Sequence, residues 1–481
     1  MQESYNTKTF WKCLFGIVLI SAFMKITGGS GFIIVPVLAF WGVITRNTRT
    51  VMFSLMVANC ALLGNAYFFP KGIVFNLAHR GMMVLLGVCV AAKVFGGRQY
   101  DIVTPFMWLI PFLIFMMLPS AFGWAPMVSF LKLFLFIVVY VAYAGVAKMA
   151  MSSSNNNIQH YRAMLLSVTA FFVIGSLVIM PFPSISFLNS ADLASDSEFI
   201  AAINEGRVVS LYKGMAFHSQ ALGPLISVLC VFLVGDLLFN IQRPDKLYIV
   251  MIAICPYLIY KTSSRTAMAG LIGGVAIMLF LFRNSRQIHW TWRAKILRLA
   301  NLIVLFMIIT MATLSNVRGE IARFALKYSS TEQAEVSAEN IMASRQGLIE
   351  KALYNWSKKP LIGNGFQVSE AMASQKREGI KDYLTAPVEK GVWIAAVLEE
   401  GGIVGLVLFC VFWISAVIAL WSRNYYATAS MLLSLIILNM AEFTIFSMSG
   451  IGGFIWAVVF VVAILDGAHK REEMEYYSPI V

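Results

Sequence analysis

Charged residues are scarce in this sequence, and their scarcity excludes a soluble globular domain. Only 13% of the 481 residues are charged, whereas 59% are hydrophobic and the mean hydropathy is +0.76. A soluble domain carries about 25% charged residues. Apolar runs of about 17–25 residues, long enough to cross a bilayer as helices, recur along the chain. The sequence therefore predicts an all-α integral membrane protein, a polytopic bundle of helices.

Several chemical motifs are also absent. There is no Walker loop, no Gly-x-Ser-x-Gly elbow, no His-Glu-x-x-His, and no Asp-x-Asp metal motif in a predicted outward loop. The six cysteines lie in apolar runs, without metal-ligand spacing or paired loop positions: Cys13, Cys60, Cys89, Cys230, Cys255 and Cys410. We therefore expect no metal, no other cofactor and no disulfide framework. An enzyme built on this chain would act on a pre-activated substrate.

Hydropathy predicts about fourteen transmembrane helices. They are expected at 10–26, 30–45, 50–69, 79–96, 102–121, 126–149, 161–181, 218–240, 246–260, 266–282, 298–315, 394–421, 425–447 and 449–466.

Lys and Arg predict how these helices are oriented. Basic pairs such as Arg46 with Arg49, and Lys148 with Arg162, share one side of the membrane if the N-terminus is cytoplasmic. The opposite short loops carry almost no charge, as the positive-inside rule requires. We therefore expect both termini in the cytoplasm. The rule accounts for most of the net charge of +13, and the remainder could serve an anionic substrate.

Two long loops then face outward, at about 182–217 and about 316–393. The second is the only large polar stretch. Within it, Ser337 to Trp356 has the apolar spacing of an amphipathic helix, which Pro360 and the turn Gly363-Asn364-Gly365 would end. Such a helix could lie on the membrane surface or cover a cavity. The chain is accordingly divided into 1–181, 182–315, 316–393 and 394–481.

Arg265 is the first candidate for an anion site. It opens the tenth predicted span from the outside. A guanidinium stays charged and holds phosphate through a planar fork of donors, and a helix start adds free backbone N–H groups. The alternative is an interfacial Arg that reaches the lipid headgroups. The large loop adds Arg318, Arg323 and Arg345, which together would give an electropositive mouth, although each alone could be merely solvated.

Polar residues also precede the eighth span. His218 stands beside Gln220, and Lys213 and Arg207 lie shortly before it. His218 either serves a site or anchors a helix end at the membrane interface.

Carboxylates mark the last third of the chain. Glu389 precedes the twelfth predicted span, and Glu399 and Glu400 fall inside its apolar run. Ionisable groups within a membrane are costly and indicate function by default. Glu399 and Glu400 could instead pair structurally with Arg265 or Arg345. Asp236 and Glu442 raise the same question.

Two phrases bracket the end of the large loop: Lys359-Pro360-Leu361-Ile362-Gly363-Asn364-Gly365-Phe366, and Leu398-Glu399-Glu400-Gly401-Gly402-Ile403-Val404-Gly405. Together they resemble the C-terminal signature of the O-antigen ligase and polymerase family of bacterial membrane glycosyltransferases. The segments Lys213–Gly223 and Ser263–Gly270 resemble further patterns of that family, in which the place of Lys213 is often held by Arg and Arg207 could substitute. The resemblance covers roughly residues 200–450.

The resemblance implies glycosyl transfer on the periplasmic face of the bacterial inner membrane, from a glycan on undecaprenyl pyrophosphate to a sugar hydroxyl. Transfer is expected to invert the anomeric centre. Arg265, with Arg345 or Arg318, would hold the pyrophosphate, and Glu389 or His218 would be the general base. Further binding candidates are Arg323, Lys213, Arg207 and Gln220, and Glu400 is a further catalytic candidate.

The chain departs from the ligase pattern at one point. Ligases place a His followed by an amide about ten residues before the Glu-x-Gly phrase, where this chain has Gly391 and Val392. We therefore expect a polymerase of exopolysaccharide, capsule or O-antigen, working with membrane lipid and with a chain-length regulator and flippase of the same lipopolysaccharide-type pathway. No nucleic acid is expected as a partner. The alternatives are a ligase acting on lipid A-core, a flippase for the same glycolipid and a non-catalytic scaffold.

Overall fold

The computed structural model describes residues 5–95, 104–152, 158–187, 212–240, 245–284, 338–370, 392–440, 444–447 and 450–477. Every regular element in these ranges is helical, and the extended backbone there forms only two isolated bridges, Gly64 with Ala216 and Phe187 with Tyr212. The all-α class is thereby confirmed for these residues.

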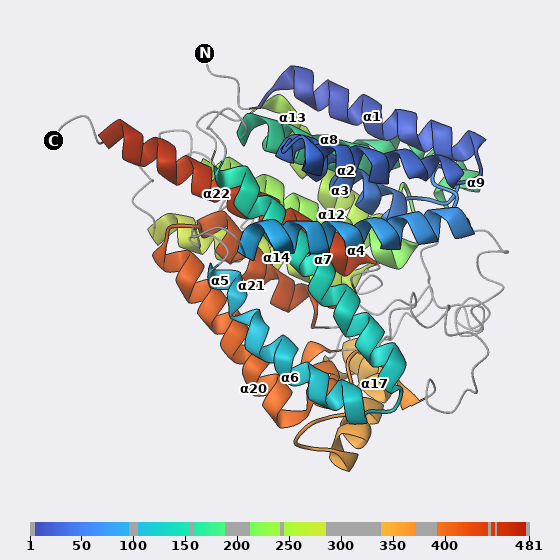
Figure 1. Ribbon diagram of the computed structural model, residues 1–481, viewed down its shortest axis with the longest axis vertical. Coiled ribbons are helices and arrows are strands. Elements are labelled where there is room, and N and C mark those ends of the chain that lie inside the picture. Colours follow the sequence, from blue (N-terminus) through green and yellow to red (C-terminus); the bar gives the residue numbers. More distant parts are fainter. Residues whose placement is uncertain are drawn as a thin grey trace, which may run out of the picture.

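The helices follow one another along the whole described chain (Figure 1). The first half contains α1 (Thr7–Ile26), the 3-10 turn η1 (Ser30–Ile33), α2 (Ile34–Ile44), α3 (Thr48–Leu63), α4 (Ile73–Phe95), α5 (Thr104–Met107), α6 (Leu109–Phe122), α7 (Pro126–Ser152), α8 (Ile158–Ile179) and α9 (Pro183–Ser186). The second half contains α12 (Ser219–Gly235), the π-helix η3 (Asp236–Asn240), α13 (Lys246–Lys261), α14 (Arg265–Asn284), α17 (Ala338–Lys358), α20 (Trp393–Ser422), α21 (Tyr426–Leu438) and α22 (Ile451–Tyr477).

Seven of the described helices are long and apolar enough to cross a membrane: α1, α4, α7, α8, α12 with η3, α20 and α22. Shorter apolar helices lie at Ser30–Ile44, Thr48–Leu63, Leu109–Phe122, Arg265–Phe280 and Tyr426–Leu438. The protein is thus built as a helical membrane protein. The predicted span 298–315 lies outside the described residues. The predicted span 102–121 is divided between α5 and α6 near Trp108, because Pro111 has no N–H to donate to the carbonyl of Met107.

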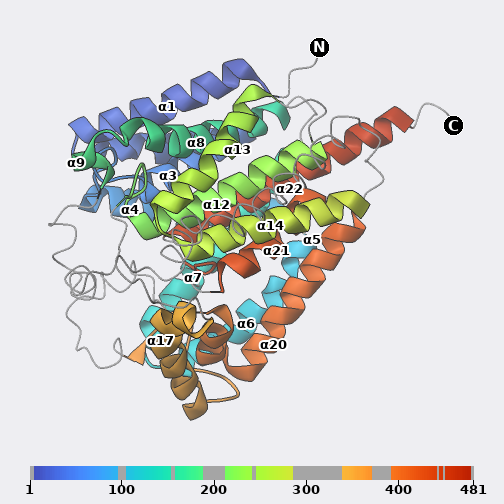
Figure 2. The ribbon, with the colours of Figure 1, turned by 180° about the vertical axis from the view of Figure 1, so that it is seen from behind.

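The outer surface of the bundle carries the apolar stripes expected of helices in lipid. On α20 the exposed side chains recur every three or four residues: Val404, Val407, Val411, Ile414 and Ile418. The opposite side of the same helix buries Phe412 and Ala416. α12 and the apolar part of α22 are instead buried all round and lie between the N-terminal helices and the pair α14–α21 (Figure 2). A water-soluble protein would not expose such long apolar stripes.

The bundle has two ends, which we call terminal and distal. Both chain termini emerge at the terminal end, and α17 lies toward the opposite, distal end (Figure 1). Three helices begin at the terminal end with a side-chain cap: Asn6 accepts a hydrogen bond from Thr9 N at 2.8 Å, and Asn47 and Asp245 cap α3 and α13 in the same way.

Candidate functional site

The centre of the candidate site is a break in α20. This helix extends from Trp393 to Ser422, but at Gly402 its backbone leaves the helical conformation, with φ 63° and ψ −165°. That region of backbone conformation is essentially restricted to glycine. Glu399 and Glu400 come directly before the break and are 4% and 2% exposed. An otherwise continuous apolar helix is therefore interrupted where its two carboxylates are buried.

The loop that follows α17 fills this break. Four backbone hydrogen bonds join the two segments: Asn364 N to Glu399 O (2.8 Å), Gly365 N to Glu400 O (3.0 Å), Ile403 N to Pro360 O (2.9 Å) and Val404 N to Leu361 O (3.3 Å). Backbone groups freed by a break need such partners away from water. A Cβ added to Gly363 would lie 2.5 Å from the Glu400 backbone, so the loop reaches the break only because that residue is glycine. The two phrases that carry the family resemblance thus bind each other directly.

Two asparagines complete the surroundings of the carboxylates. Asn355 Nδ2 on α17 donates to Glu399 Oε1 at 2.8 Å, and Asn364 Nδ2 donates to the Asn355 carbonyl at 3.0 Å. Both asparagines are 1% exposed. Within the described part of the chain, the Oδ1 atoms of both are buried without a hydrogen-bond partner. Each Oδ1 can therefore accept a hydrogen bond from water or a hydroxyl.

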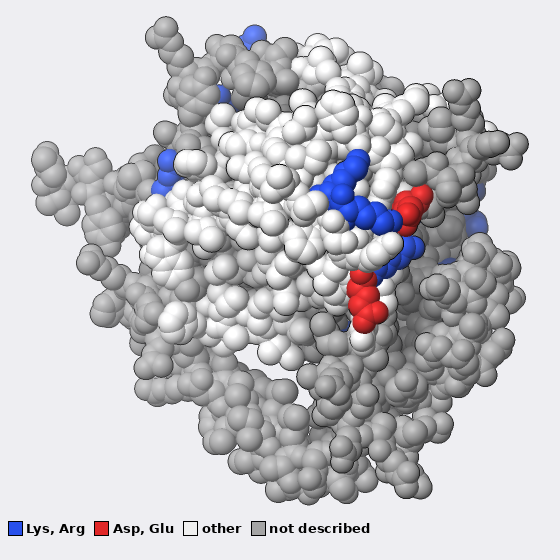
Figure 3. Space-filling view, turned by 90° about the horizontal axis from the view of Figure 1, so that it is seen from below, with Lys and Arg blue, Asp and Glu red and all other residues white. Residues whose placement is uncertain are grey.

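The predicted amphipathic helix is confirmed as α17, which ends at Lys358 just before Pro360. Asn355 and Ala352 face inward, and Asn355 contacts the break in α20. Charged side chains follow on its outer side and in the next loop: Glu350, Lys351, Lys358, Lys359 and Glu370. From below, charged side chains gather in one area of a mostly uncharged described surface (Figure 3). Lys358 and Glu370 form an ion pair at 3.2 Å.

The turn between α6 and α7 holds the loop from its other side. Lys359 Nζ donates to Phe122 O at 2.6 Å, and Trp124 N donates to Asn364 O at 3.1 Å. Further along, Lys132 Nζ, which is buried on α7, donates to Gln367 O at 3.0 Å. The residues of this turn were not among the sequence predictions. They follow a generic apolar run, and only the tertiary structure brings them to the site.

A second group of predicted residues lies where α12 and α14 begin. His218 caps α12, and its Nδ1 accepts a hydrogen bond from Gln220 N at 3.1 Å. In the neutral imidazole this assignment leaves the proton on Nε2. Arg265 is the first residue of α14. The segments that hold His218 and Arg265 pack closely against each other at Gly223 and Ser264. A Cβ added to Gly223 would lie only 2.5 Å from the Ser264 Cβ.

Lys213 lies on a folded part of the segment that leads to His218. Lys213 is buried, and its backbone N donates to Ser186 O at 2.8 Å. Asn65, in the turn after α3, fixes this segment by donating from Nδ2 to Gly214 O at 2.9 Å.

Sequence reasoning missed Lys71, which belongs to the same turn as Asn65. Its Nζ donates to Leu62 O and lies 4.6 Å from the Phe217 ring centroid. Although Lys71 as a whole residue is exposed, desolvation lowers the pKa of its ammonium to about 8. The only sequence signal was a lysine in a Pro-Lys-Gly turn between two apolar runs.

Several predicted residues are not placed at either group. Arg207, Arg318, Arg323, Glu389 and Glu442 lie outside the described residues, and Arg345 falls in the N-terminal part of α17. In the described part of the chain no three His, Cys, Asp or Glu side chains converge as metal ligands.

Asp236 belongs to the terminal end, far along the bundle from the break. Arg162 Nε donates to its Oδ2 at 2.9 Å, and Arg162 Nη2 donates to its Oδ1 at 3.2 Å. Tyr248 OH adds a hydrogen bond to Asp236 Oδ2 at 2.7 Å. The sequence left open whether Asp236 is functional or structural, and these contacts favour a structural role. Arg162, counted among the loop cations in the sequence, is itself buried.

No protein-family model matches this chain, and no curated protein sequence matches it.

Proposed function

We propose that the protein is a glycosyltransferase of the bacterial inner membrane that polymerises lipid-linked oligosaccharide repeat units. In this proposal about fourteen helices cross the membrane, both termini are cytoplasmic, and the distal end faces the periplasm. The donor is a glycan on undecaprenyl pyrophosphate and the acceptor is a sugar hydroxyl of a second repeat unit or growing chain.

One observation carries the proposal: the two phrases of the family resemblance interlock around Glu399 and Glu400 at the break in α20. Interrupting a membrane helix and burying carboxylates there are both costly, and such sites are retained where they serve a substrate or ion. The acceptor atoms on Asn355 and Asn364 suit a hydroxyl-rich ligand.

The chemistry needs a cation at the leaving group and a base at the acceptor. The acceptor oxygen bonds to the anomeric carbon, the bond from that carbon to the pyrophosphate oxygen breaks, and the acceptor proton passes to the base. Arg265 at the start of α14 would stabilise the departing pyrophosphate through its fixed fork of donors. His218, whose segment packs against that of Arg265, or Glu389 would take the proton. Glu400 would orient the acceptor.

The test uses lipid-linked repeat units extracted from the source bacterium and purified protein in nanodiscs. We expect wild type to give a ladder of products on a gel and Arg265→Ala to abolish this ladder. Of the variants Glu389→Gln and His218→Gln, the one that removes the general base should also abolish it. Lys246→Ala, which removes an exposed cation at the start of α13 and outside the proposed site, is the matched control and should keep the ladder. Transfer only after lipid A-core is added would mean a ligase. Absence of any glycosyl transfer with both acceptors would reject the enzyme.

The broken α20 also favours a second candidate function, a flippase for the same glycolipid. Transporters commonly bind substrate at helices that are discontinuous within the membrane. Movement of the glycolipid across sealed vesicles, without any change in its length, would favour this candidate over the polymerase.

A further inference from the structure

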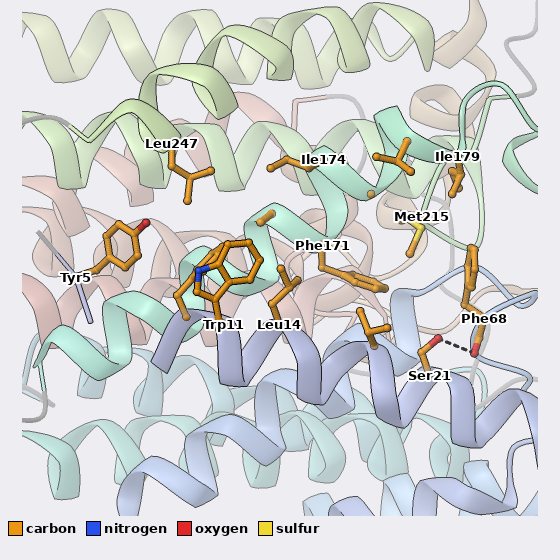
Figure 4. A pocket seen from close by; sticks show the side chains of 15 residues that line it. Tyr5, Trp11, Leu14, Ser21, Phe68, Phe171, Ile174, Ile179, Met215 and Leu247 are labelled. Carbon is orange, nitrogen blue, oxygen red and sulfur yellow. Dashed lines mark hydrogen bonds between the residues drawn. The ribbon is translucent and has the colours of Figure 1, made fainter. Parts of the chain in front are cut away.

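An apolar groove runs along the outside of the N-terminal helices (Figure 4). It has a volume of about 600 Å³ and lies between α1, α8 and the start of α13. Tyr5, Trp11 and Leu247 line one end, and Phe68, Ile179 and Met215 line the other (Figure 4). Apart from Ser21, the Tyr5 hydroxyl and the Trp11 indole N–H, its lining side chains are apolar. The groove therefore offers nothing to a polar ligand along most of its length and fits a hydrocarbon chain.

Along α1 the lining of the groove recurs every three or four residues, at Trp11, Leu14, Val18 and Ser21. At about 1.5 Å per residue Trp11 and Ser21 are about 15 Å apart along the helix, which is about half of a hydrocarbon core of about 30 Å. The same stripe of α1 continues beyond the groove to Lys25, about one turn after Ser21. A hydrocarbon chain that fills the groove would therefore end about one helical turn from this lysine.

A positive charge stands at the distal end of the groove. Lys25 is exposed, and its Nζ lies 3.8 Å from the centroid of the Tyr67 ring. The neighbouring Phe68 closes the groove, with its carbonyl accepting a hydrogen bond from Ser21 Oγ at 3.2 Å. The last lining residue, Met215, lies three residues before His218. The groove thus ends near a cation and near the segment that holds the candidate base.

We propose that this groove binds the isoprenoid chain of a polyprenyl-phosphate carrier, with the phosphate at Lys25. The assignment rests on the proposed function for the identity of the carrier, but binding can be measured without glycosyl transfer. The chain would enter sideways from the bilayer, because the wall residues Trp11, Val18 and Val178 are exposed on the lipid-facing surface. Its phosphate end would then be presented toward the start of α12.

The test is native mass spectrometry of the full-length protein in detergent, titrated with undecaprenyl phosphate. Val18→Trp fills the groove, and Leu19→Trp places the same side chain at the adjacent exposed residue that does not line it. We expect Val18→Trp to weaken binding by about tenfold or more, and Leu19→Trp to bind like wild type. Lys25→Gln should weaken binding severalfold, whereas Lys12→Gln, nearer the terminal end of the same helix, should not.

Three outcomes of this titration would overturn the assignment: equal binding by the Val18→Trp and Leu19→Trp variants, no binding by wild type, or displacement of the probe by an equal concentration of dioleoyl phosphatidylglycerol. The last would assign the groove to ordinary phospholipid. Rejection of the lipid-binding assignment can be distinguished from rejection of the proposed polymerase function. Polymer made equally by wild type and Val18→Trp would reject the groove alone, and groove-dependent binding without polymer would reject the polymerase alone.

Discussion

The two ends of the bundle bury ionisable groups in different ways. At the terminal end, Asp236 receives hydrogen bonds from Arg162 and Tyr248, and Asp466 receives them from Asn240 and Thr428. At the distal end, Glu399 and Glu400 lie at a break in α20, where the loop after α17 binds their backbone carbonyls and Asn355 Nδ2 donates to Glu399 Oε1. The terminal carboxylates are thus enclosed by side-chain donors, whereas acceptor atoms remain available beside the distal ones.

We interpret this difference as one between a structural role and the proposed functional role. A buried charge that is matched by an opposite charge and saturated with hydrogen bonds fixes how helices pack. A buried carboxylate beside unmatched acceptor oxygens retains capacity to bind a ligand. We therefore expect substitutions at the terminal end to act on stability, and substitutions at the distal end to act on activity at smaller cost to the fold.

The largest expected effect comes from Arg162→Met. This change leaves Asp236 buried without its cation, which should lower the free energy of unfolding by about 3–5 kcal/mol. Denaturation in detergent can be followed by dye labelling of Cys60, Cys230 and Cys255, which are buried and free in the folded protein. The double variant Arg162→Met/Asp236→Leu removes both charges and should recover much of the loss. A single variant as stable as wild type would mean that the network does not hold the terminal end together.

Gly402→Ala should have the next largest effect, and it acts on the distal end. The φ and ψ at this residue cost an alanine about 1–3 kcal/mol, and the new Cβ would lie 2.3 Å from the Leu361 carbonyl. We expect loss of product formation together with this loss of stability. Gly405→Ala is the matched control, since its nearest neighbour, a Phe115 ring carbon, would be 3.5 Å away. Equal activity of the two variants would refute a role for the break.

The sequence predicted local features well and the break not at all. Spacing and the Pro360 stop located α17 because both are local signals. The run from Trp393 to Ser422 is apolar throughout, so hydropathy could not separate its two parts, and only Gly401-Gly402 hinted at an interruption. Arg162 was placed among loop cations because a sequence does not reveal that Asp236, on another helix, neutralises it.

Asn355→Ala tests the surroundings of Glu399 more gently. It removes the donor to Glu399 Oε1 and should cost about 1–3 kcal/mol of stability. If the Asn355 side chain also binds substrate, the KM for the repeat unit should rise by more than kcat falls. Ser357→Ala, on the exposed side of the same helix, serves as the control. Unchanged KM with reduced stability would restrict Asn355 to a structural role.

The smallest expected effect is a pH dependence that Lys71 gives to the distal end. Its pKa is about 8 in the folded protein and 10.5 ordinarily, so the unfolded state binds more protons between these values. Stability should therefore rise with pH from about 8 to 10.5, because deprotonation of Lys71 relieves the desolvation cost that is fully present below pH 8. Lys71→Met should flatten this rise, and Lys12→Met, near the terminal end of α1, should leave it intact. If both variants keep the rise, the slope arises elsewhere and Lys71 is hydrated in solution.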